Sequence, residues 1–115
     1  MSVPIFVDEL KVDGYNIKIY TFSNKKRKPK IIINSLSRTI DGTLLGIKLL
    51  GPSDKVFGNE GKIIYRIEIR FRNKGYHQDE PIAYYNDRIV LFSKSKKNID
   101  KIQTFISKYI NKKEE

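Results

Sequence analysis

Residues 62–74 read Lys62-Ile-Ile-Tyr-Arg-Ile-Glu-Ile-Arg-Phe-Arg-Asn-Lys74, and this stretch sets the pattern for the whole chain. One parity is apolar and comprises Ile63, Tyr65, Ile67, Ile69 and Phe71. The other parity is mostly charged, broken only by Ile64, and comprises Lys62, Arg66, Glu68, Arg70, Arg72 and Lys74. Because successive side chains of a strand point to opposite sides of a sheet, the stretch predicts a strand with one buried and one cationic face.

The cationic face of this strand indicates a polyanionic partner. Cations two residues apart on a strand lie about 7 Å apart, close to the phosphate spacing of an extended nucleic-acid strand. The chain has 115 residues, which predicts a single domain over residues 1–115, and it carries 23 Lys and Arg against 13 Asp and Glu, a net charge of +10. This charge favours nucleic acid, an anionic membrane face or an acidic protein as partner, and the alternative is that it only confers solubility.

Cysteine is absent from the chain, which excludes disulfides and thiolate metal sites. No apolar run approaches the roughly 18 residues of a membrane span, and the N-terminus lacks the pattern of a signal peptide. We therefore expect a cytoplasmic protein without a membrane partner.

Two Asp-Gly dipeptides predict two hairpins, because Asp-Gly suits the two left-handed positions of a type I′ turn. The first hairpin spans residues 5–22 and turns at Asp13-Gly14, which places Glu9 opposite Lys18. Pro4 precedes its first strand and predicts that this strand lies at an edge of the sheet. The second hairpin spans residues 31–50 and turns at Asp41-Gly42. Its apolar face would then comprise Ile32, Leu36, Ile40, Leu45, Ile47 and Leu49, with Gly46 marking a bulge or a close backbone approach.

Three segments between the strands read as loops. Residues 23–30 hold a basic run, in which a phosphate-contacting role and simple solvation are equally compatible with the pattern. Its cations are Lys25, Lys26, Arg27, Lys28 and Lys30. Residues 51–61 bring Val56 and Phe57 into a Gly- and Pro-containing loop, and residues 73–81 form another. Residues 82–92 resume the strand pattern, with a break expected near Asn86-Asp87.

A helical period begins near Lys96. Apolar residues at spacings of three and four form one stripe, comprising Ile99, Ile102, Phe105, Ile106, Tyr109 and Ile110. Ser95 or Asn98 is expected to cap the helix, and Asp100 to lie in its first turn. The stripe is expected either to cover the apolar face of the sheet or to form a dimer seam.

Catalytic chemistry has little support in the sequence. The single histidine, His77, lies beside Asp79 and Glu80, a set from which we expect no metal site. Glu9-Leu10-Lys11 with Asp8 resembles the Glu-x-Lys motif of metal-dependent restriction-type nucleases. In the predicted hairpin, however, Glu9 lies opposite Lys18, and a cross-strand ion pair gives the Glu9 side chain a structural role. We therefore expect no enzymatic activity and no cofactor.

These patterns together predict an α+β domain, namely a twisted antiparallel sheet of about six strands packed by one C-terminal helix. The expected function is non-catalytic, sequence-tolerant binding of DNA or RNA, with single strands as a candidate ligand and with a homodimer joined through sheet edges or helices as a candidate assembly. The expected phosphate contacts are Lys25, Lys26, Arg27, Lys28, Lys30, Lys62, Arg66, Arg70, Arg72 and Lys74, and the expected stacking platforms are Tyr20, Tyr76 and Tyr85. The alternative is a small viral or mobile-element interaction module that docks on an acidic protein.

Overall fold

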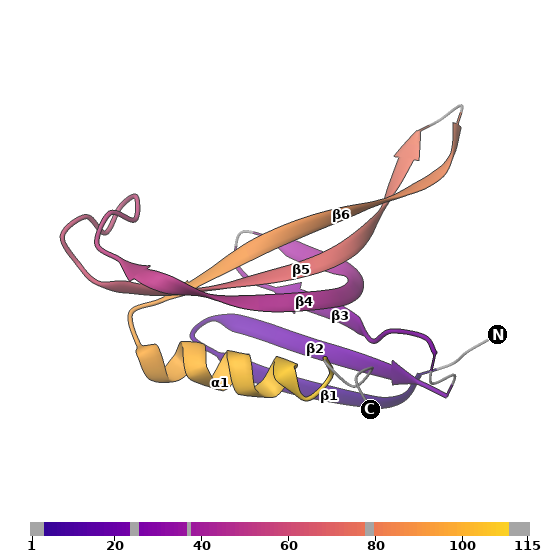
Figure 1. The fold of residues 1–115 in the computed structure, drawn as a ribbon, viewed down its shortest axis with the longest axis horizontal. Helices are drawn as coiled ribbons and strands as arrows, with labels where there is room; N and C mark the ends of the chain where they lie inside the picture. Colours follow the sequence, from indigo (N-terminus) through magenta and orange to yellow (C-terminus); the bar gives the residue numbers. More distant parts are fainter. Residues whose placement is uncertain (1–3, 24–25, 37, 78–79, 111–115) are drawn as a thin grey trace.

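The computed structural model describes residues 4–23, 26–36, 38–77 and 80–110; for residues 4–5, 74–77 and 80–85 it describes the backbone alone. Within these residues, six strands precede one helix (Figure 1). The strands are β1 (Pro4–Val12), β2 (Tyr15–Phe22), β3 (Lys30–Asn34), β4 (Thr39–Ser53), β5 (Ile64–His77) and β6 (Glu80–Ser93), and the helix is α1 (Lys96–Ser107).

Each strand pairs antiparallel with the next one along the chain, so the order across the sheet is β1-β2-β3-β4-β5-β6. The sheet bends so that β4, β5 and β6 form an upper layer in Figure 1, while β1, β2 and α1 form a lower layer. The predicted α+β class, an antiparallel sheet with one C-terminal helix, is confirmed, and β1 lies at an edge as Pro4 indicates. No helix in the described part of the chain has the length and apolar composition of a membrane span.

The β1–β2 hairpin turns at Asp13-Gly14 in the predicted register. Asp13 has a φ of 51° and Gly14 a φ of 83°, the left-handed conformations that a type I′ turn requires. The resulting pairs include Val12 with Tyr15, Leu10 with Ile17, and Glu9 with Lys18. The inward parity is therefore apolar, while Glu9 and Lys18 lie on the opposite face.

The second predicted hairpin is wrong. β3 and β4 are joined by a turn between Asn34 and Thr39, and Asp41-Gly42 lies inside β4, where Ile33 pairs with Ile40. The Ser35 hydroxyl supplies the turn bonds, since its Oγ accepts from the Arg38 amide at 3.2 Å and donates to the Arg38 carbonyl oxygen at 3.0 Å. The register shift changes which side chains face the core. The buried residues of these strands are Ile31, Ile33, Ile40 and Leu44, and the predicted core residue Leu36 is fully exposed.

Gly42 is required by a close backbone approach. A Cβ atom at this position would lie 2.5 Å from the Arg72 carbonyl oxygen and 2.9 Å from Cδ2 of Phe71. Any side chain here would therefore push β5 away from β4.

One predicted loop, residues 73–81, is largely strand, and the predicted loop at residues 51–61 is shorter than expected. β5 and β6 continue to a pair between His77 and Glu80, through most of residues 73–81, and β6 is unbroken at Asn86-Asp87. β4 likewise continues to Ser53. The β5–β6 hairpin projects beyond the layers at the upper right of Figure 1. Strands that pair only with each other through backbone hydrogen bonds need no alternation of apolar and polar residues, so the sequence of this segment does not show the strand pattern.

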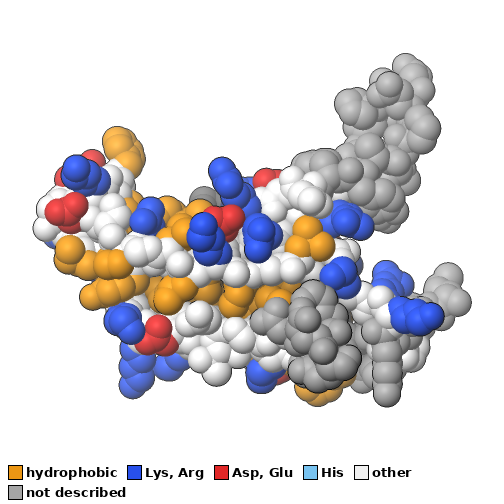
Figure 2. All heavy atoms as spheres, viewed as in Figure 1, with side chains coloured by type: hydrophobic (Ala, Val, Ile, Leu, Met, Phe, Trp, Pro, Cys, Tyr) orange, Lys and Arg blue, Asp and Glu red, His pale blue; other side chains and the backbone are white. Residues whose placement is uncertain are grey.

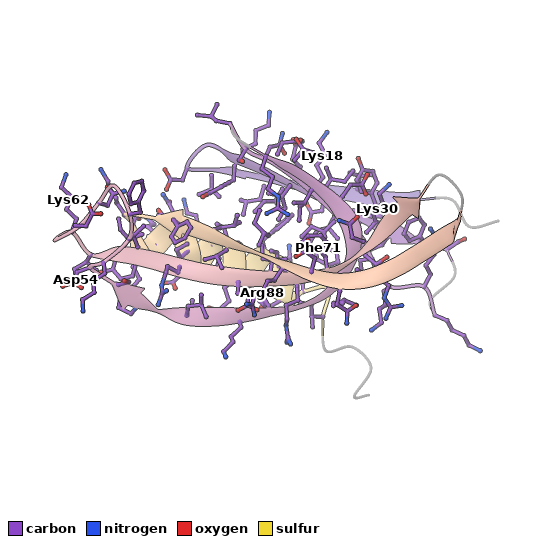
Figure 3. The ribbon with its side chains drawn as sticks, turned by 90° about the horizontal axis from the view of Figure 1, so that it is seen from above. Lys18, Lys30, Asp54, Lys62, Phe71 and Arg88 are labelled. Carbon is purple, nitrogen blue, oxygen red and sulfur yellow. The ribbon has the colours of Figure 1, made fainter. Side chains whose placement is uncertain are left out.

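The core lies between the upper layer and the lower layer of β1, β2 and α1, and β3 also contributes to it. Phe71 lies at its centre (Figure 3) and has no exposed surface. The helix contributes Ile99, Ile102, Phe105 and Ile106 to the same apolar cluster as the strands. Because the chain buries these four residues within itself, they form core packing and not a dimer seam.

The start of α1 is capped as the sequence indicates. Ser95 is the N-cap, and its Oγ accepts from the Asn98 amide at 3.3 Å. Asp100 lies beyond the first turn, contrary to the prediction, and its carboxylate pairs with Lys96 at 3.3 Å.

Two tyrosine hydroxyls tie distant elements together. The Tyr15 hydroxyl accepts from the Phe92 amide at 3.1 Å and donates to the Phe92 carbonyl oxygen at 3.3 Å, which joins β2 to β6. The Tyr109 hydroxyl donates to Asp8 Oδ2 at 2.5 Å and so holds the end of the helical region against β1. This bond holds the pKa of Asp8 below its ordinary value of 3.8, with smaller contributions from the Glu9 amide and Lys108.

Replacing Tyr109 by phenylalanine is expected to lower the free energy of unfolding by about 1 kcal/mol at neutral pH, because a charge-assisted hydrogen bond is lost. The pKa of Asp8 is lowered in the folded protein, so this stabilisation is present above pH 3.8 and is lost as the pH falls further. Urea unfolding at pH 7 and at about pH 2.5 measures both effects. The matched control is Tyr15→Phe, which removes a bond between neutral groups and should cost the same at both pH values. Equal losses at both pH values for Tyr109→Phe would contradict the assignment.

Candidate nucleic-acid interface

The outer face of the upper layer is the face of β4, β5 and β6 that points away from α1. Ile67, Ile69 and Phe71 of β5 are fully buried toward the helix, so the alternating residues point outward. These are Arg66, Glu68, Arg70 and Arg72, as the sequence predicts. The parity is reversed at the start of the stretch, where Ile64 is 3% exposed and Ile63 is 52% exposed, because β5 begins at Ile64 after an irregular pairing with β4.

Three arginines come together on this face where β5 pairs with β6. Arg70 lies directly opposite Arg88, and Arg72 is the next outward residue along β5. On the other side Arg70 faces Gly46, where an added Cβ atom would lie 3.2 Å from Arg70 Nη2. The Arg70 side chain therefore extends across Gly46, next to the bulge between Leu44 and Gly46. We call Arg70, Arg72 and Arg88 the arginine cluster.

The arginine cluster forms no ion pair within the described part of the chain. Its three guanidinium groups form neither an ion pair nor a hydrogen bond there. Other surface cations do form such pairs, including Lys30 with Asp41 at 3.4 Å and Lys108 with Asp8 at 3.5 Å. Like charges directly opposite each other on paired strands are destabilising, so the cluster is an arrangement that an anionic ligand would stabilise.

The surroundings of the cluster carry charges of both signs. Figure 2 shows lysine and arginine side chains over the upper layer, with acidic side chains among them. Figure 3 looks onto this layer from above and places Arg88 near its middle. Glu68 is the outward acidic residue of β5, and it lies opposite Lys48 of β4.

The predicted contacts Arg66, Lys62 and Lys30 lie apart from the cluster or already have partners. The Arg66 guanidinium donates to the Gly51 carbonyl oxygen from Nε at 2.9 Å and from Nη2 at 2.7 Å. Lys62 lies in the β4–β5 loop at one end of the molecule (Figure 3), and Lys30 pairs with Asp41. We therefore assign Arg66 a structural role in addition to its charge.

The basic loop approaches the arginine cluster from the β3 side. Lys26, Arg27 and Lys28 are exposed, and the Arg27 guanidinium lies 4.1 Å from the centre of the Phe22 ring. The next residue, Pro29, accepts from the Leu44 amide at 2.8 Å, which places the end of the loop beside β4. Only β4 then separates this loop from Arg72, a distance of about 10 Å.

Tyr20 lies on the outer face of β2, between Val7 of β1 and Lys30 of β3. It is half-buried, so one part of its ring is accessible beside a cation. The remaining predicted contacts lie outside the described residues or side chains, namely Lys25, Lys74, Tyr76 and Tyr85.

Sequence reasoning missed Arg88. Its partner Arg70 is defined only by the β5–β6 register, which the expected break at Asn86-Asp87 obscured. The sequence does contain a signal for Arg88, namely the alternation of side chains along the strand. Arg88, Val90 and Phe92 alternate with the inward residues Ile89 and Leu91, so Arg88 is expected on the outer face.

The nuclease-like residues do not converge in the structure. Asp8 binds Tyr109 and Lys108, while Glu9 pairs with Lys18 on the opposite parity of β1. Within the described residues, no three His, Asp or Glu side chains are grouped so that they could hold a metal ion.

No family model, curated protein or solved structure matches this chain. The function is therefore inferred from the geometry of the outer face.

Proposed function

We propose that this protein binds nucleic acid without catalysing a reaction, through the outer face of the upper layer. The observation that carries the proposal is the arginine cluster, in which Arg70 and Arg88 oppose each other without forming an ion pair in the described structure. Arginine contacts to phosphate position a nucleic acid without reading its bases, so the binding is sequence-tolerant. The absence of cysteine agrees with a reducing, cytoplasmic setting for such a protein.

A single strand suits this surface better than a duplex groove. Recognition in the major groove commonly inserts a helix, but the arginine cluster lies on β5 and β6 of the sheet and not on α1. An open sheet face with cations and an accessible ring beside them resembles the surfaces on which single strands lie. The basic loop and Tyr20 extend this surface from the arginine cluster toward β2.

Equilibrium titration of single-stranded DNA, duplex DNA and RNA of equal length, at several salt concentrations, tests the proposal. The expected result is tightest binding to single strands, with log K falling linearly with log salt by about 0.7 for each phosphate contact. Three contacts from the arginine cluster alone predict a slope of about −2. No binding to any of the three at low salt would contradict the proposal and favour an acidic protein as partner.

A further inference from the structure

A pocket lies at the end of the upper layer, where the β4–β5 loop approaches the connection between β6 and α1. Its volume is about 870 Å³, within the range of sites that bind small ligands. Figure 3 marks this end of the molecule by Asp54 and Lys62 of the loop. The lining combines apolar, cationic and small polar side chains, and it includes Phe57, Phe92, Lys55, Arg66, Lys94 and Asp13.

The loop holds an aromatic ring in solvent at the pocket. Phe57 is 94% exposed, contrary to the usual tendency of phenylalanine to be buried. The loop backbone around it is closed by internal bonds, with the Asn59 amide donating to the Val56 carbonyl oxygen at 2.9 Å and the Gly61 amide donating to that of Asp54 at 2.8 Å. The exposed ring is therefore carried by a loop whose backbone conformation is fixed by internal hydrogen bonds. Phe92, on the outer face of β6, adds a second accessible ring at 41% exposure.

The charges of the pocket favour an anionic ligand. Lys55, Arg66 and Lys94 line it, against one lining carboxylate, that of Asp13. A ligand that satisfies this lining has a flat aromatic part for the rings and a negative group for the lysines. A nucleotide unit has both parts.

The pocket is continuous with the arginine cluster. Phe92 lies opposite Arg66, and Arg88 opposite Arg70, with one outward pair between them on the same two strands. The distance along β5 from Arg70 to Arg66 is about 14 Å, the span of two or three nucleotides of an extended strand. A nucleic-acid strand bound at the cluster would reach the pocket by crossing the outward pair of Glu68 and Val90.

We propose that this pocket takes one unpaired nucleobase of the strand bound by the arginine cluster, stacked on Phe57 with its phosphate beside Lys55 and Lys94. The inference rests on the proposed function and deepens it, because a stacking pocket accepts any base but only an unpaired one. It accounts for both a preference for single strands and a tolerance of sequence.

The test compares two ligands of equal charge, an eight-residue oligothymidylate and an eight-residue abasic sugar-phosphate oligomer. Phe57→Ala should weaken binding of the oligothymidylate by about 5-fold to 150-fold, the loss expected for one stacked base, and leave binding of the abasic oligomer unchanged. Phe57→Tyr should restore wild-type affinity, because tyrosine stacks equally well. The matched control is Leu36→Ala, which removes another fully exposed apolar side chain, in the β3–β4 turn, and should affect neither ligand.

The outcomes separate the pocket from the proposed function. If wild type binds both oligomers and Phe57→Ala changes neither affinity, the pocket assignment is overturned while nucleic-acid binding stands. If Phe57→Ala weakens both oligomers equally, the residue does not contact a base, and the assignment is again overturned. If wild type binds neither oligomer at low salt, the pocket and the proposed function fail together.

Discussion

Replacing Phe71 by alanine is expected to lower the free energy of unfolding by about 3 to 5 kcal/mol. The ring has no exposed surface and lies in the cluster that joins β5 to α1, so truncation leaves a cavity that the surrounding strands cannot fill. A domain of this size is stabilised by roughly 5 to 15 kcal/mol in total, so the loss is a large fraction of it. Urea unfolding followed by circular dichroism measures the change.

Phe57→Ala is the matched control, since it makes the same substitution at a ring that is 94% exposed. Its expected effect on stability is within about 0.5 kcal/mol. Equal losses for the two variants would show that the core is not centred on β5 and would contradict the packing of Phe71 in the cluster that joins β5 to α1. Phe71 also lies between Arg70 and Arg72 in the sequence, so its burial sets the outward direction of both arginines.

The second large effect is expected from the arginine cluster. Changing Arg70, Arg72 and Arg88 together to glutamine should reduce the magnitude of the salt slope by about 2 and weaken single-strand binding on the order of 100-fold at 0.1 M salt. The free energy of unfolding should stay unchanged or rise by under about 1 kcal/mol, because the opposed pair of like charges is removed. Salt-dependent titration and urea unfolding of the same variant measure the two quantities.

The control for this variant is Lys11, Lys97 and Lys101 changed to glutamine, which removes three exposed charges from β1 and α1. If net charge alone governed binding, both triple variants would lose affinity equally. Affinity equal to wild type in the folded arginine variant would exclude the outer face as the binding surface.

Local signals in the sequence predicted those features that local chemistry determines. Asp13-Gly14 set the first hairpin register, and the strict alternation from Tyr65 to Arg72 separated core from surface on β5. The helical stripe and its Ser95 cap were likewise predicted. Each of these features depends on residues that are neighbours in the chain or on the same element.

The Asp-Gly signal gave a wrong prediction for the second hairpin, because contacts between β4 and β5 determine the position of Gly42. Asp41-Gly42 has the composition of a turn, but Gly42 is needed because the Arg72 backbone of β5 passes within 2.5 Å of where its Cβ atom would be. The actual turn uses Ser35, whose hydroxyl signal is weaker in sequence. The arginine cluster was predicted in part, through Arg70 and Arg72, but Arg88 and the Phe57 pocket depend on strand register and on loop placement.

The most direct test of the central proposal is an NMR titration of the ¹⁵N-labelled protein with a short single-stranded oligonucleotide. The proposal predicts that the largest amide shift changes follow the outer face, around Arg70, Arg72 and Arg88, and extend to the basic loop at Lys28 and to the pocket at Phe57. Shift changes confined to the exposed side of α1 around Lys97 and Lys101, or no shift changes at low salt, would contradict it.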